Sequence, residues 1–189
     1  MEFLEIIKSS QVQKILAYFF TNPEKKHYVR ELAALLDEDA GNLSRALKKL
    51  EDEKIFLVSY IGKQKFFSLN KNHPLFAELK SLVEKTIGVA GALEKEIPKI
   101  RGISQGFIYG SWAKRQPSFG SDIDLFLVGK FDEEKLLKVI AKLEKRLGRE
   151  INYVFFAPKE FRRAKKLNSF VQGVMKSPKI MIVGKENEL

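Results

Sequence analysis

The stretch from Gly110 to Gly129, GSWAKRQPSFGSDIDLFLVG, decides how the second half of the chain is interpreted. It follows an apolar run at 107–109 and ends in a second apolar run that contains two carboxylates, Asp122 and Asp124. Alternate side chains of a strand share one face, so both carboxylates would point the same way. Two carboxylates this close have raised pKa values unless a cation lies between them. We therefore predict that they hold Mg²⁺, which accepts one or two carboxylates and fills its other positions with water and phosphate oxygens.

A glycine–serine pair opens the same stretch. Gly110 allows the backbone to approach a ligand closely, and Ser111 could cap a short helix whose free amides face an anion. The pattern thus predicts a phosphate site beside the metal site. The alternative is a plain turn and a strand with two solvent-facing aspartates, but the spacing of the Gly-Ser pair and the apolar runs on both sides favour the ligand site.

These motifs resemble a known family. Gly110-Ser111, Ala113 and the run from Ser121 to Leu125 are similar to the minimal nucleotidyltransferase signature of the DNA polymerase beta superfamily. Segments 86–88, 148–153 and 178–180 resemble proteins that fuse this domain to a winged helix. The resemblance implies that Asp122 and Asp124 are catalytic and bind Mg²⁺. It also implies that a nucleoside triphosphate such as ATP is held by Gly110, Ser111, Lys114 and Ser121.

Active members of this superfamily usually carry a third carboxylate on a neighbouring strand. The strand expected to supply it is 151–156, where Asn152 occupies the matching position. An amide ligates a metal weakly and cannot act as a base, so the resemblance implies nucleotide binding and leaves catalysis open. Glu150 would share a strand face with Asn152 and is the other candidate, although it lies about 7 Å further along the strand.

Composition narrows the classes of protein. The chain of 189 residues contains no cysteine, which excludes disulfides, cysteine nucleophiles and thiolate metal sites and fits a cytoplasmic protein. No apolar run approaches the length of a membrane span, and residues 1–5 lack the pattern of a secretory signal. Residues 1–97 carry 15 Lys and Arg against 14 Asp and Glu, whereas residues 98–189 carry 19 against 10. The excess of positive charge in the second half favours nucleic acid, nucleotides or an acidic protein partner.

Three helices and a hairpin are predicted in the first half. Apolar periodicity places helices at 11–20, at 29–36 and from about 40 to 52, and two apolar runs at 56–61 and 65–69 flank a Gly-containing turn. Segment 42–47 resembles the recognition helix of bacterial and archaeal winged-helix regulators. Such a helix enters the major groove of double-stranded DNA, and the wing contacts phosphates. The predicted DNA-binding residues are Asn42, Ser44, Arg45, Lys48, Lys49, Lys63 and Lys65.

The alternative for this basic face is a solvated helix surface on a domain that serves dimerisation. The nearly balanced charge of the first half supports that alternative. Charge local to the reading helix matters more than the total, so DNA binding is favoured.

In the second half, an amphipathic helix is predicted at 133–147 between apolar runs, which indicates a strand-helix-strand unit. A connecting helix is predicted at 74–92, a basic helix at 159–166 and a last strand at 179–183. We therefore expect a two-domain α+β chain. Residues 1–92 would form a winged helix-turn-helix domain with a connecting helix, and residues 93–189 a nucleotidyltransferase-like α/β domain with a mixed sheet.

Three hypotheses of function follow. The first is a cytoplasmic, homodimeric transcription regulator whose nucleotidyltransferase-like domain senses a nucleotide with Mg²⁺. The second is an active Mg²⁺-dependent enzyme that transfers a nucleoside monophosphate to a protein or small-molecule hydroxyl, as superfamily members paired with toxins do. The third is a protein-interaction module in which both sites are idle.

Overall fold

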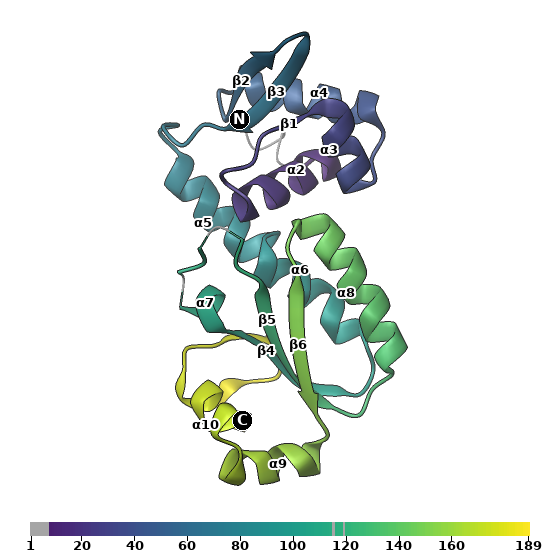
Figure 1. The fold of residues 1–189 in the computed structure, drawn as a ribbon, viewed down its shortest axis with the longest axis vertical. Coiled ribbons are helices and arrows are strands. Elements are labelled where there is room, and N and C mark those ends of the chain that lie inside the picture. Colours follow the sequence, from purple (N-terminus) through teal and green to yellow (C-terminus); the bar gives the residue numbers. More distant parts are fainter. Residues whose placement is uncertain (1–7, 115, 119) are drawn as a thin grey trace. The chain divides into compact units, whose positions relative to one another are not determined.

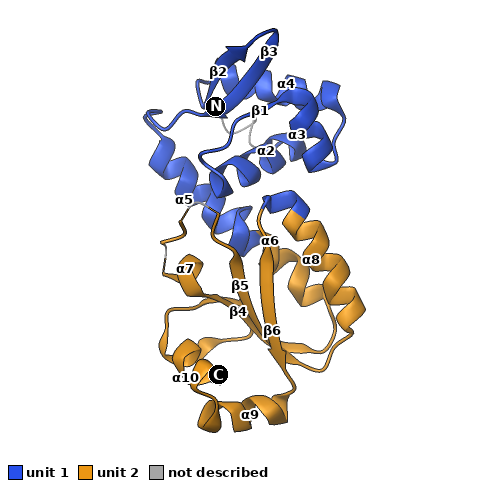
Figure 2. Cartoon of the chain, viewed as in Figure 1, with its two compact units in different colours: residues 1–91, 145–148 blue, residues 92–144, 149–189 orange. Residues whose placement is uncertain are grey.

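The structure is a computed structural model that describes residues 8–114, 116–118 and 120–189. The chain divides into two compact units, residues 1–91 with 145–148 and residues 92–144 with 149–189 (Figure 2). None of the helices in the described ranges is long and apolar enough to cross a membrane.

The first unit combines helices with a small antiparallel sheet (Figure 1). Its elements are α2 (Ser10–Thr21), β1 (His27–Tyr28), α3 (Val29–Leu36), α4 (Ala40–Asp52), β2 (Phe56–Ile61), β3 (Gln64–Leu69), α5 (Phe76–Thr86) and the start of α6 (Val89–Glu96). Strand β3 lies between β1 and β2. The hairpin turns at Gly62, which has a φ of 58° that glycine adopts without steric cost.

Apolar side chains at helical spacing form the core of this unit. Ile15, Leu16 and Phe19 of α2 pack with Leu47 of α4, and all four are fully buried. Phe19 meets Phe56 of β2 edge to face, with 4.8 Å between ring centroids. Each such buried side chain contributes about 1.5–3 kcal/mol to folding, so the core fixes which face of α4 points outward.

The second unit is built on a mixed four-stranded sheet of order β6-β5-β4-β7. Strands β5 and β6 are parallel, and β4 runs antiparallel to both β5 and β7. The parallel pair is joined by helix α8, as such a pair requires. The elements are 3₁₀ helix η1 (Ile97–Lys99), β4 (Ile103–Tyr109), α7 (Gly110–Ala113), β5 (Ile123–Gly129), α8 (Glu133–Leu147), β6 (Ile151–Phe156), α9 (Pro158–Leu167), α10 (Ser169–Lys176), β7 (Ile180–Val183) and 3₁₀ helix η2 (Glu186–Glu188).

Helices α9 and α10 cover one face of this sheet. Phe107 and Phe126 stack on that face with ring centroids 4.9 Å apart, and Phe161 of α9 and Val171 of α10 pack against them. Figure 1 draws α8 alongside the sheet, away from α9 and α10. Successive side chains of β4 and β5 therefore point alternately to the face under α9 and α10 and to the opposite face. Only side chains on the same face can meet at the site.

One predicted helix differs from the structure, and one helix of the structure was not predicted. The helix predicted at 74–92 is two helices, α5 and α6, separated at Gly88, whose N–H donates to the Val83 carbonyl at 2.6 Å. A Cβ at Gly88 would lie 3.0 Å from the backbone of α5, so the chain turns closely there. Helix α10 was not predicted. It begins at the Asn168 cap, whose side chain accepts from the Val171 N–H at 3.2 Å.

Candidate active site

Three strand ends meet where the sequence predicted a ligand. Asp124 of β5 lies opposite Tyr109 of β4 on one side and Asn152 of β6 on the other. Directly paired residues of a sheet share a face, so these side chains form a row. Because β4 is antiparallel to β5 and β6, its carboxyl end lies beside their amino ends. The row therefore lies where α7 leaves β4 and where β5 and β6 begin.

Gly110 brings the backbone directly against Asp124. Its φ is 70°, and a Cβ at this position would lie 2.2 Å from Asp124 Oδ2. Any other residue would thus meet both backbone strain and a clash with the carboxylate. The structure thus brings the Gly110 backbone against a carboxylate, and its approach to a ligand stays a prediction.

Ser111 does not cap a helix, which corrects the expectation from sequence. Helix α7 begins at Gly110, its N-cap residue is Tyr109, and no side chain caps it. The turn at Gly110 starts the helix before the serine, so Ser111 lies inside the first turn. Its carbonyl accepts from the Gln116 N–H at 3.0 Å, and its half-buried side chain stays beside Gly110.

The two aspartates differ in environment. Asp122 is exposed, and its Oδ2 accepts a hydrogen bond of 3.1 Å from Asn152 Nδ2. Asp124 is half-buried, and burial, followed by the charge of Asp122, raises its pKa above the ordinary value. Burial and the charge of Asp124 likewise raise the pKa of Tyr109. Asp124 is thus the carboxylate with the raised pKa, burial is the larger cause, and a bound cation would oppose the rise.

Three other predicted site residues lie around this row. Lys114 is exposed at the end of α7. Ser121 uses its hydroxyl inside the loop, where Oγ accepts from the Ser118 N–H at 2.8 Å. Glu150 is exposed just before β6, and its carbonyl accepts from the Ile123 N–H at 2.9 Å, which places its backbone beside the start of β5. No side-chain hydrogen bond or ion pair of Glu150 occurs within the described ranges.

The donor set fits Mg²⁺ with an incomplete protein shell. Within the part of the chain that the structure describes, no three His, Cys, Asp or Glu residues cluster as metal ligands. Asp122 and Asp124 supply two carboxylates, and Asn152 directs an amide N–H at one of them. Mg²⁺ tolerates such a shell because it keeps several waters and takes oxygens from a bound triphosphate.

Sequence reasoning missed Tyr109. Its ring meets Phe126 and Phe170 edge to face, at centroid distances of 6.3 Å and 5.9 Å. The signal was present, because Tyr109 is the last residue of the apolar run before Gly110 and alternates with buried Ile108. It forms the wall of the row next to Asp124.

The predicted DNA-binding residues lie on α4, at the β2–β3 turn and on β3, and most of them are exposed. Exposed residues of α4 are Asn42, Ser44, Arg45, Lys48 and Lys49. Lys63 is exposed at the β2–β3 turn, and half-buried Lys65 lies on β3. Several of these side chains bind one another or nearby acids: Arg45 donates to Asn42, Lys48 to Asp52 at 2.7 Å and Lys65 to Glu51 at 2.7 Å.

Comparison with solved structures finds a toxin–antitoxin with AMP-PNP, 20% identical over 50% of this chain and 76% of that chain, with a TM-score of 0.37. A mutant of the toxin-antitoxin MntA-HpeT is 18% identical over 50% and 75%, with a TM-score of 0.36. The tri-AMPylated HEPN toxin in complex with MNT antitoxin from Shewanella oneidensis gives 17% over 53% and 76%, with a TM-score of 0.33. These values carry no conclusion about this chain.

No curated protein matches the sequence. Residues 91–176 match the family model described as nucleotidyltransferase domain. The matched range contains Gly110, Asp122, Asp124 and Asn152. Residues 91–176 are therefore similar to a nucleotidyltransferase domain, and the row at the edge of the mixed sheet lies within this range.

Proposed function

We propose that the second unit binds a nucleoside triphosphate with Mg²⁺ and transfers the nucleoside monophosphate to a hydroxyl group of a protein or small molecule. The observation that carries the proposal is the approach of Gly110 to Asp124, with a Cβ position 2.2 Å from Asp124 Oδ2, inside the range that matches a nucleotidyltransferase domain. Backbone this close to Asp124 would hold phosphate oxygens next to a metal ligand.

Each residue has a proposed part. Asp122 and Asp124 hold Mg²⁺, the backbone N–H groups of the Gly110–Ser111 turn donate to the triphosphate, and exposed Lys114 adds a positive charge nearby. Bound Mg²⁺ would neutralise charge on the carboxylates and phosphates. The acceptor oxygen bonds to the α-phosphorus, the bond from that phosphorus to the bridging oxygen breaks, and pyrophosphate leaves with the electron pair. The hydroxyl proton passes to solvent water.

The residue at position 152, an asparagine, determines the rate of nucleotidyl transfer that we expect. A carboxylate at this position would strengthen metal binding and accept the proton of the attacking hydroxyl, whereas an amide does neither well. The amide N–H of Asn152 donates to Asp122, one of the two proposed metal ligands. We therefore propose that transfer is slow while nucleotide binding is retained. Glu150, which lacks a side-chain partner within the described ranges, is the other possible source of a carboxylate.

The proposal is tested by measuring the transfer of labelled nucleoside monophosphate from ATP to an acceptor. Purified protein, Mg²⁺ and ATP labelled at the α-phosphate are incubated with a cell extract, and calorimetry measures nucleotide binding. The proposal expects Mg²⁺-dependent binding and a slow transfer of label, both lost in Asp124→Asn and kept in Glu134→Ala, which changes an exposed acid of α8. Binding that persists undiminished in Asp124→Asn would place the nucleotide elsewhere.

A second candidate is a regulator in which the first unit binds double-stranded DNA as a homodimer and the second unit senses the nucleotide. The favouring observation is that α4 exposes five polar residues while Leu43, Ala46, Leu47 and Leu50 of the same helix are buried. The order of three helices followed by an antiparallel hairpin agrees with a winged helix. Retardation of promoter fragments, with analytical ultracentrifugation for the oligomeric state, tests this candidate.

A further inference from the structure

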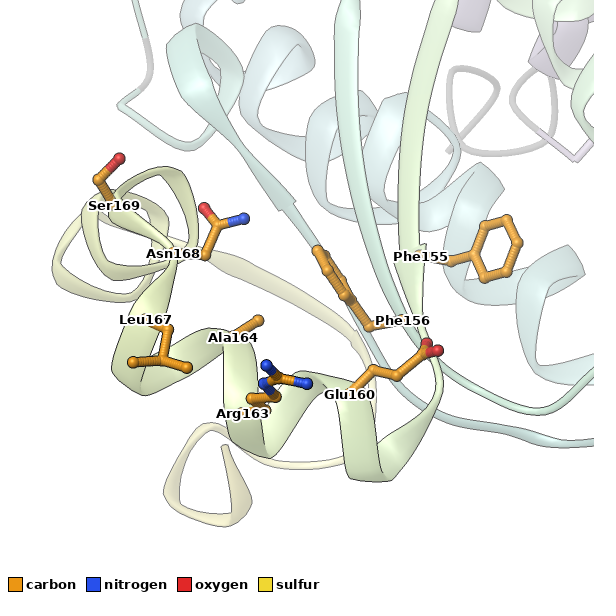
Figure 3. Close-up of a pocket in the computed structure, with 8 residues that line it drawn as sticks. All are labelled: Phe155, Phe156, Glu160, Arg163, Ala164, Leu167, Asn168 and Ser169. Atoms are coloured by element: carbon orange, nitrogen blue, oxygen red, sulfur yellow. The ribbon is translucent and has the colours of Figure 1, made fainter.

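A groove of about 700 Å³ opens between the end of β6 and helix α9 (Figure 3). Its lining on α9 follows helical spacing, because Glu160, Arg163, Ala164 and Leu167 lie three or four residues apart on one stripe. Phe156 closes it on the strand side, and Figure 3 shows Phe155 pointing to the opposite side of β6. The volume is that of a binding site for a small molecule or a few side chains.

The groove carries apolar surface that the fold does not cover. Leu167 is 73% exposed although it is a large aliphatic residue at the mouth of the groove. Phe156 stacks on Phe126 with centroids 5.5 Å apart and ring planes 21° apart, so one face of its ring is used inside the unit. Beside this ring the groove offers a partner the side chains of Ala164 and Leu167, aliphatic surface that suits side chains of a protein.

The helix that carries this apolar surface is strongly basic, and its Arg163 lines the groove. Helix α9 holds five cations and one acid, Glu160, whose carboxylate accepts from the Ala157 N–H at 3.0 Å as part of the helix cap. Lys165 is held by the Leu189 carbonyl and lies over the Phe161 ring. The other four cations are exposed and form no ion pair among residues 8–114, 116–118 and 120–189, namely Lys159, Arg162, Arg163 and Lys166.

We propose that the α9 groove binds an acidic, amphipathic helix of a partner protein. Leucine-like side chains of the partner would cover Leu167 and fill the groove beside Ala164, and its carboxylates would pair with the free cations of α9. An amphipathic helix laid in a groove is a common recognition mode, and charge complementarity specifies its acidic polar face. Uncompensated charge beside uncovered apolar surface favours this occupant over a purely apolar or purely anionic one.

This surface is distinct from the nucleotide site. Asn152 and Phe156 are four residues apart on β6, so the two places are about 13 Å apart along one face of the sheet. The proposal therefore does not depend on nucleotidyl transfer. Changes in the groove should leave nucleotide binding unaltered, and calorimetry with ATP and Mg²⁺ reports that separately.

The test uses the full chain and a fluorescein-labelled helical peptide with leucines at i, i+4 and i+7 and glutamates on the other faces. Fluorescence anisotropy should show saturable binding that weakens with added salt. Arg163→Glu and Leu167→Ser should each weaken it by about tenfold or more. Matched controls on α8 are Lys138→Glu and Leu137→Ser, exposed residues of the same kinds, and they should stay within about twofold.

Four results would overturn the proposal. They are no binding of the peptide at millimolar concentration, equal binding of a peptide with lysine in place of every glutamate, equal binding of a peptide with its leucines scrambled, and equal weakening by the α8 controls. A duplex DNA that competes with the peptide and loses its own binding in Arg163→Glu would instead assign the surface to nucleic acid.

Discussion

The face of α4 in the first unit and the row at the edge of the second sheet are both polar, but they balance their charges differently. On α4, the Asp52 carboxylate, by hydrogen bond and charge, raises the pKa of Lys48, and Arg45 is held by Asn42. At the sheet edge, burial and then the charge of Asp122 raise the pKa of Asp124, and the only group that donates to Asp122 among the described residues is the Asn152 amide.

Arg45 and Lys48 of α4 have partners within the fold, whereas the carboxylates of the row have no cation beside them among the described residues. Exposed ion pairs such as Lys48–Asp52 contribute little to stability, because solvent screens both charges, and they are easily exchanged for contacts with solvent or phosphate. At the row, half-buried Asp124 is opposed by burial and by the charge of Asp122, and a bound cation would remove that opposition. The two surfaces therefore differ in whether their charges are balanced within the fold.

The largest expected effect is that of Asp124→Asn. Removing one of two carboxylate ligands should weaken Mg²⁺-dependent nucleotide binding by about 100-fold or more, since even changes in groups behind a metal ligand cost about 10–100-fold. Calorimetry with ATP measures the loss. The thermal midpoint at neutral pH should not fall, because the substitution removes a carboxylate whose ionised form is disfavoured. If Asp124→Asn kept its Mg²⁺-dependent nucleotide binding, the row would not be the nucleotide site.

Asn152→Asp tests the same row by adding to its charge. With Mg²⁺ present, the third carboxylate should raise transfer by about 10²-fold, the lower end of what a positioned base contributes. Without Mg²⁺, it should lower the thermal midpoint, since a third negative charge replaces the amide that donates to Asp122. Transfer that is fast in the natural protein and unchanged in Asn152→Ala and Glu150→Gln would show that neither position limits the rate.

Local patterns in the sequence predicted much of the fold. The helix predicted at 133–147 has those bounds in the structure, because Leu136, Ile140, Leu143 and Leu147 recur on one buried stripe. Helix α10 was missed because its eight residues include Gly173 and two valines, which weaken a helical pattern. Its signal was the cap at Asn168, which only the bond to Val171 makes visible.

Contacts between distant segments could not be predicted in the same way. The position of Asn152 came from resemblance, but its bond to Asp122 depends on the register between β5 and β6, in which Asp124 pairs with Asn152. The α9 groove depends on how the end of β6 meets a helix after the strand has ended. The Asn152–Asp122 hydrogen bond and the α9 groove both arise from packing between segments far apart in the sequence. Periodicity and composition do not predict which residues of such segments meet.

On α4, Arg45→Ala should cost DNA binding about 1–3 kcal/mol and relax preference at one base position. Asp52→Asn should act in the opposite direction and slightly strengthen binding, because it frees Lys48 and removes a negative charge from the same face. Gel retardation across a range of salt concentrations measures both. If neither variant changes retardation of any fragment, the satisfied charges of α4 are a solvated surface, and the regulator candidate is lost.

The smallest expected effect is the pH dependence of stability. Burial and the charge of Asp122 raise the pKa of Asp124 in the folded protein above its unfolded value. A raised pKa means that folding favours the neutral acid, so this group stabilises fully below its unfolded pKa, and the stabilisation is lost as pH rises through the folded pKa. Metal-free protein should therefore lose stability relative to Asp124→Asn across that window, by a few degrees at most in the thermal midpoint.

Saturating Mg²⁺ favours the ionised form of Asp124 and should abolish or reverse the difference in thermal midpoint. Thermal unfolding of both proteins from about pH 4 to pH 7, with and without Mg²⁺, measures it. Parallel pH profiles in all four series would mean that Asp124 is not opposed by its surroundings, and the contrast with α4 would then lose its electrostatic basis.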